Sequence, residues 1–200
     1  MNENKNATFI QRLGALVIDL LMLLCISSII TTVTVDMDNY QKLSKELTSV
    51  ENQYKKGKIA PMTYISKAID INYDISRETG LSTIIMVAVY ILYFIIFQFK
   101  KNGQTLGKKI MKIRVVSNDD KDLNINQIAV RSLIINCILA DLLVLTVSIL
   151  GSKNVYMVGI FTVEFIQYIL LFVIAIMVLS RKDKRGLHDV ITNTKVIKEV

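Results

Sequence analysis

Four long apolar stretches constrain this chain more than any other feature of its sequence. They cover residues 13–35, 81–99, 128–150 and 155–179, and a helix needs about 17–25 mostly apolar residues to cross the hydrocarbon of a bilayer. Each stretch is apolar around its whole circumference, unlike a helix on the surface of a soluble domain. Backbone amides find no water partners in lipid, so the stretches should be α-helical. The sequence therefore predicts an all-α integral membrane protein with four transmembrane helices.

Composition agrees with this class and excludes several others. Of the 200 residues, 52% are hydrophobic and 20% are charged, so the charges must be segregated from the apolar stretches. The aliphatic content excludes a disordered chain. One histidine and two cysteines are too few for a disulfide scaffold or for the usual four zinc ligands. The sequence contains no paired nucleophile and base and no phosphate-binding loop, so we expect neither an enzyme nor a bound metal or cofactor.

Basic residues are unevenly distributed between the segments that connect the spans. Residues 100–127 contain seven basic and three acidic residues, and the tail from residue 181 contains six and three. Residues 36–80, by contrast, contain seven of each. The positive-inside rule then places both termini and residues 100–127 in the cytoplasm and residues 36–80 outside, in a bacterial inner membrane. The net charge of +7 suits anionic headgroups at the inner face, and we expect no nucleic-acid partner.

The outer segment, residues 36–80, is too long for a simple loop. Apolar residues recur at helical spacing before Gly57, and Pro61 can begin a second helix. An extracytoplasmic helical hairpin is therefore expected. It can serve as a packing cap over the bundle, or residues 38–79 can bind a protein partner.

The inner segment contains a short helix and a short strand. Thr105 can cap a helix that includes Lys108, and residues 113–116, which are mostly β-branched, follow it. A second β-branched run covers residues 194–197. Neither run is long enough to stand alone, so we expect them to pair as a small cytoplasmic two-stranded ribbon.

Ionisable residues within the spans are costly and point to function. A charge at the bilayer centre costs roughly 2.5–3.5 kcal/mol on insertion scales, so such residues should face the bundle interior. Arg12, Asp19 and Arg131 lie near the inner boundary and can form one cluster in which a nearby cation keeps Asp19 ionised. That cluster is either a structural salt bridge or part of an ion site.

Asp141 and Glu164 lie at similar depth on spans joined by a short turn, and no basic residue of the spans matches that depth. Two carboxylates in one dry site cannot both stay ionised cheaply, which is the chemistry of a site for a proton or a monovalent cation. The alternative is that one carboxyl group is protonated and bonded to a neighbouring polar side chain.

Three motifs, in this order, resemble the RDD family of bacterial membrane proteins. They are FIQRLGALVID at 9–19, GQTLGKK at 103–109 and RGLHD at 185–189. The resemblance implies one membrane domain over residues 7–198, with residues 36–80 as a helical insertion. It also places the family's name-giving arginine on Arg12 and its first aspartate on Asp19. The family's second aspartate corresponds to Asp189, with Asp141 as the alternative position.

The residues and the resemblance together lead to two hypotheses about function. The first is an exchanger of monovalent cations and protons, in which Asp19, Asp141 and Glu164 carry the ion. Arg12, Arg131 and Asp189 would then act as electrostatic and structural partners. Four spans are few for a transport path, so this hypothesis implies a homo-oligomer. The second is a non-transporting assembly, sensing or regulatory protein of the membrane.

Overall fold

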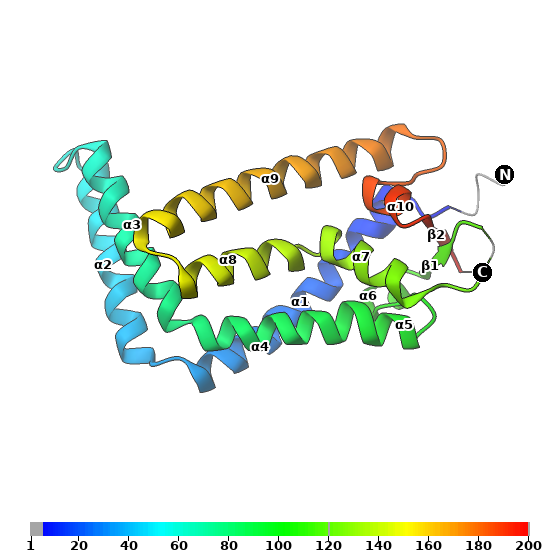
Figure 1. The fold of residues 1–200 in the computed structure, drawn as a ribbon, viewed down its shortest axis with the longest axis horizontal. Helices are drawn as coiled ribbons and strands as arrows, with labels where there is room; N and C mark the ends of the chain where they lie inside the picture. The colour runs from blue at the N-terminus through cyan, green and yellow to red at the C-terminus, as the bar shows by residue number, and fades with distance from the viewer. Residues whose placement is uncertain (1–5, 120, 200) are drawn as a thin grey trace.

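The computed structural model describes residues 6–119 and 121–199, and it consists mainly of long helices (Figure 1). The helices run along one direction, with a helical hairpin across one end and a two-stranded ribbon at the other. We call these the hairpin end and the ribbon end. The predicted all-α class with a small ribbon is confirmed.

Three helical segments are long and apolar enough to cross a membrane. They are α1 (Phe9–Thr34), the segment Gly80–Lys100 and α9 (Lys153–Ser180). The second segment is continuous but changes its winding, from α4 (Gly80–Ile91) through the π-helical η2 (Leu92–Phe97) to α5 (Gln98–Lys100). π-Helical turns are rare and frequently lie at functional sites.

The fourth apolar stretch, residues 128–150, is not the continuous helix that we expected, so the described residues contain three such helices, or four if this bent pair is counted as one span. This stretch consists of α7 (Ile125–Ile135) and α8 (Ile138–Leu150), which are bent by 63° at the break between them. Cys137 lies at the break with a left-handed backbone, φ 60° and ψ 9°. No proline or glycine marks this position, so the sequence gives no local signal for the bend.

The predicted hairpin consists of α2 (Met37–Lys55) and α3 (Pro61–Glu78), with Pro61 in the first turn of the second helix. It packs on the turn between α8 and α9. The hydroxyl of Tyr73 donates to the carbonyl of Gly151 at 3.1 Å, and the Tyr73 ring meets the edge of Tyr156 with centroids 5.3 Å apart. These contacts fit the cap interpretation, while partner binding by residues 38–79 stays a prediction.

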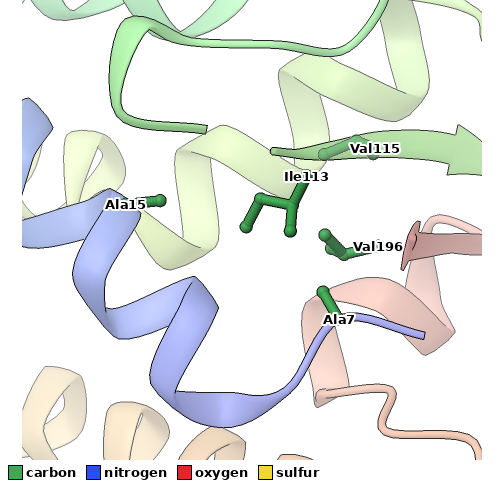
Figure 2. Packing of buried hydrophobic residues seen from close by; sticks show 5 residues of the cluster. All are labelled: Ala7, Ala15, Ile113, Val115 and Val196. Atoms are coloured by element: carbon green, nitrogen blue, oxygen red, sulfur yellow. The ribbon is translucent and has the colours of Figure 1, made fainter. Parts of the chain in front are cut away.

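The ribbon pairs β1 (Ile113–Ser117) with β2 (Thr194–Lys198) in antiparallel register, Val115 opposite Val196. The predicted pairing is therefore confirmed. Figure 2 shows the cluster in which ribbon side chains pack against Ala7 and Ala15, and all five members are at most 2% exposed: Ala7, Ala15, Ile113, Val115 and Val196. The ribbon thus fixes both ends of the described chain against α1.

Candidate functional site

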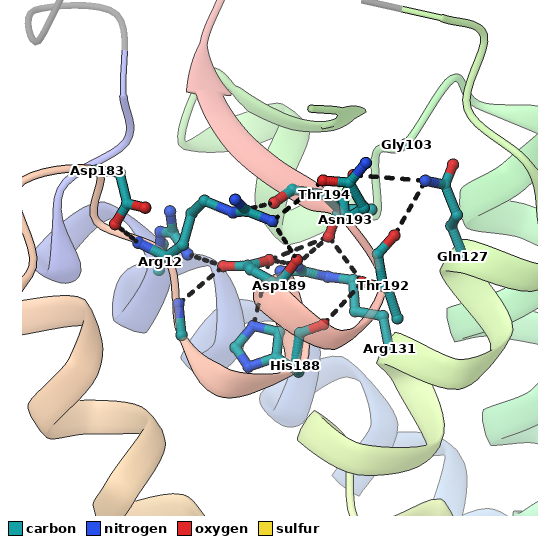
Figure 3. A network of polar contacts seen from close by, with 12 residues as sticks. Arg12, Gly103, Gln127, Arg131, Asp183, His188, Asp189, Thr192, Asn193 and Thr194 are labelled. Atoms are coloured by element: carbon teal, nitrogen blue, oxygen red, sulfur yellow. Dashed lines mark hydrogen bonds and ion pairs between the residues drawn. The ribbon is translucent and has the colours of Figure 1, made fainter. Parts of the chain in front are cut away.

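Asp189 is the centre of a polar network at the ribbon end (Figure 3). It lies in α10 (Leu187–Ile191) and its side chain is 0% exposed. Arg12 reaches it from α1, with Nη1 2.7 Å from Oδ2, and Arg131 from α7 forms an ion pair with Oδ1. One buried carboxylate therefore holds two guanidinium groups from different spans.

Neighbouring groups complete the coordination of Asp189. The amide of Gly186 donates to Oδ2 at 3.2 Å, and the hydroxyl of Thr194 lies 3.3 Å from Oδ1. Arg185 fixes the surrounding backbone, since it donates to the carbonyls of Thr194 and Asp189, each at 2.9 Å. A buried charge is tolerated only when it is paired and hydrogen-bonded, and Asp189 meets both conditions.

Asp19 accepts hydrogen bonds from three donors and contacts neither arginine. Oδ1 accepts from the Tyr93 hydroxyl at 2.5 Å and from the amide of Gly107 at 2.7 Å, and Oδ2 accepts from the Thr105 hydroxyl at 2.6 Å. Thr105 and Gly107 belong to the start of α6 (Leu106–Ile110), with Thr105 as its N-cap. Asp19, which is 2% exposed, therefore anchors this short helix on α1.

The expected cluster of Arg12, Asp19 and Arg131 is thus corrected. The two arginines bind Asp189, while Asp19 is stabilised by hydroxyl and amide donors. The physical reason is that the tail folds back beneath the spans and brings a second carboxylate within reach of both guanidinium groups. Reasoning along the spans missed Tyr93 and Thr105 as partners of Asp19, although Thr105 was visible as a helix cap.

A cavity of about 290 Å³ lies beside this network. Its charged lining residues are Arg12, Asp19, Lys108 and Arg131, and the rest of its wall is mostly apolar. Burial lowers the pKa of Lys108 to about 8, with Arg131 and Arg12 adding repulsion and Asp19 opposing it. Arg12, Arg131 and protonated Lys108 carry three positive charges, and Asp19 and Asp189 carry two negative charges. These five side chains therefore have one net positive charge.

His188 is kept neutral beside the same network. Its side chain is 3% exposed, and its pKa lies well below 6.5 because of burial and the repulsion of Arg131, Arg12 and Lys108. A group with a lowered folded pKa binds its proton first in the unfolded state.

The free energy of unfolding should therefore fall as the pH decreases below about 6.5, with a limiting slope of about 1.4 kcal/mol per pH unit. His188 is the single histidine of the sequence, so the His188→Gln variant should flatten this part of the curve. Chemical unfolding in detergent between pH 7.5 and 5.5 measures both slopes. Equal slopes for the two proteins would contradict the assignment.

Asp141 lies in the first turn of α8, just after the break between α7 and α8. It is half-buried, and within residues 6–119 and 121–199 its carboxylate makes no hydrogen bond or ion pair. Electrostatic coupling links it to Tyr90 and Cys137. Asn136, the last residue before Cys137, lines the cavity.

Glu164 occupies a different environment on α9. It is exposed on the surface of the bundle, and its one interaction with another described residue is electrostatic, with Tyr156. No hydrogen bond or ion pair of the described chain joins it to Asp141. The expected shared pair of carboxylates is therefore not formed within a single copy in this structure.

Comparison with known proteins adds one finding. A model of the RDD family matches residues 6–193, which is nearly the whole chain. Comparisons with curated proteins and with solved structures found no match.

Proposed function

The chain belongs to the RDD family, and from this premise we propose that it is a membrane protein that exchanges monovalent cations for protons, with Asp141 as the ion-carrying carboxylate. The observation that carries the proposal is the half-buried Asp141 side chain, which has no described partner and follows a break in a span. Ionisable groups in the hydrocarbon are costly, and one without a structural partner is a functional candidate.

The helix break supplies the other groups that such a site needs. Broken helices are common at the ion sites of transporters, where the free carbonyls at a half-helix C-terminus coordinate cations. The last turn of α7 ends at the break, and the hydroxyl-bearing Tyr90 is coupled to Asp141. A proton and a cation would compete for the same carboxylate, and this competition is the basis of exchange.

Asp19 and Glu164 have different roles in this proposal. Three donors already hold Asp19 in a structural role, so we place the ion at Asp141 rather than there. Glu164 is exposed on an apolar helix, where a second copy of the chain would shield it from lipid. The proposed assembly is therefore a homo-oligomer in the inner membrane, with the ribbon end in the cytoplasm.

Proton flux in liposomes tests the proposal. Purified protein should dissipate an imposed pH gradient when Na⁺ or K⁺ is added, as a pH-sensitive dye inside the vesicles reports. Asp141→Asn should reduce this flux to the level of empty liposomes. Glu164→Gln is the matched control, because it makes the same chemical change on the neighbouring span, and it should retain the flux.

Three outcomes would contradict the proposal or part of it. Wild-type flux equal to that of empty liposomes would overturn exchange altogether. Undiminished flux in Asp141→Asn would remove the ion from Asp141. Loss of flux in Glu164→Gln alone would transfer the site to Glu164 and the interface between copies.

A further inference from the structure

We propose that the cavity at the ribbon end binds the anionic headgroup of a membrane lipid, with the phosphate held by Arg12 and Lys108. Asp141, the ion-carrying residue of the proposed exchange site, does not line this cavity, although Asn136 at the helix break does, so the two sites are neighbours with different charged groups. The argument rests on unpartnered donors, on net charge, and on the apolar wall of the cavity.

Several buried nitrogen atoms around the cavity have no hydrogen-bond partner. Arg12 uses Nη1 to bind Asp189, but its Nε and Nη2 are buried and bond to nothing in the described chain. Leaving a buried donor unsatisfied costs about 1–3 kcal/mol, and more for a charged group, so these atoms call for an acceptor.

Lys108 supplies a further cation without a carboxylate in contact. Its Nζ atom lies 3.5 Å from the Thr105 hydroxyl, and no salt bridge of the described residues includes it. Together with Arg12 and Arg131 it outnumbers Asp19 and Asp189 by one charge. A single phosphate monoanion would neutralise the site, and planar guanidinium groups suit phosphate oxygens.

The remaining wall of the cavity is apolar and reaches the surface of the bundle. Phe9, Leu13 and Leu16 line it from α1, and Leu171, Ile174 and Val178 line it from α9. Leu13 is 46% exposed although it lines the cavity, so the cavity opens towards the surface that faces hydrocarbon. A free inorganic anion would gain nothing from this wall, whereas a lipid can place its headgroup among the cations and its chains along α1 and α9.

The volume of the cavity suits a headgroup rather than a whole lipid. A cavity of about 150 Å³ is enough for benzene, so about 290 Å³ accommodates a phosphate and the first carbons attached to it. The acyl chains would then lie outside, against the exposed face of α9, on which few residues are buried.

Native mass spectrometry of the whole protein in neutral detergent tests the inference, with phosphatidylglycerol as the probe. We expect phosphatidylglycerol to bind at least tenfold more tightly than phosphatidylcholine, whose headgroup carries no net charge. Lys108→Met should weaken phosphatidylglycerol binding about tenfold. Lys109→Met, which removes the same charge from an exposed neighbour in α6, is the matched control and should leave it unchanged.

A second variant keeps the test independent of charge. Ala175 lines the cavity from α9, so Ala175→Phe should fill it and weaken lipid binding while all cations remain. Equal binding of the two lipids, or equal affinity in Lys108→Met and Lys109→Met, would overturn the inference. Competition by inorganic phosphate as effective as that by phosphatidylglycerol would also overturn it, since the site would then be one for free anions. None of these results depends on ion flux.

Discussion

Replacement of Asp189 by asparagine should lower the free energy of unfolding by about 3–5 kcal/mol, because it leaves Arg12 and Arg131 buried beside each other without their shared counter-ion. The Asp189 carboxylate also accepts from the Gly186 amide and the Thr194 hydroxyl. The asparagine side chain has an NH₂ group in place of one of these accepting oxygens, so one of the two donors loses its acceptor. We expect the α1, α7 and α10 contacts at the ribbon end to open first. Thermal unfolding in detergent, followed by circular dichroism, measures the change.

Asp122→Asn is the matched control for this prediction. It makes the same chemical change at an exposed position of the segment between β1 and α7, where no described hydrogen bond or ion pair includes the side chain. Exposed substitutions of this kind stay within about 0.5 kcal/mol. If Asp189→Asn does not fold, the double variant Arg12→Met with Asp189→Asn should recover part of the loss, since one unpaired charge is removed. Equal stability of the two single variants would refute the central role of Asp189.

Gly107→Ala should be the next most damaging substitution, with a loss of about 1–3 kcal/mol from overpacking. A Cβ atom at this position would lie 2.8 Å from Oδ1 of Asp19 and closer still to the carbonyl of Ala15. Because the obstacles include the backbone of α1, α6 must shift away. The shift would lengthen the hydrogen bond from the Gly107 amide to Asp19, which is 2.7 Å in the native protein.

Gly80→Ala separates this steric effect from the general effect of replacing glycine in a helix. A Cβ atom at Gly80 meets nothing within 4 Å, so alanine there should leave stability unchanged or raise it by roughly 0.5–1 kcal/mol. The difference between the two variants in unfolding midpoint is the quantity to compare. A Gly107→Ala protein as stable as Gly80→Ala would show that α6 is not held closely against α1.

Local patterns were sufficient to predict several elements of the fold. The helical spacing before Gly57 and the position of Pro61 predicted the hairpin, and the two β-branched runs predicted the ribbon. Thr105 was predicted to cap a helix and does so, accepting from the amide of Lys108 at 3.3 Å. Each of these signals depends on residues close together in the chain or on a short, distinctive run.

The bend at Cys137 could not be predicted in the same way. Residues 128–150 are mostly apolar, and the polar residues among them include neither proline nor glycine, so the sequence does not distinguish two half-helices from one helix. Contacts from other elements fix α7 instead: Gln127 donates to the carbonyl of Thr192 at 2.9 Å, and the Ser132 hydroxyl donates to the carbonyl of Phe94 at 2.9 Å. These partners are distant in sequence, so they give no local signal for the bend.

The sequence by itself determined the class of this protein, since the length and strong apolarity of its spans leave a chain few alternatives to helices in lipid. It also located the ionisable residues that had to be shielded. Only the tertiary structure decided which of them meet. It gave both arginines to Asp189, gave Asp19 to hydroxyl and amide donors, and separated Asp141 from Glu164. The physical reason is that the tendency of a segment to enter lipid can be summed from its own residues. Which ionisable side chains pair depends instead on how each helix is rotated and on where the distant tail folds back.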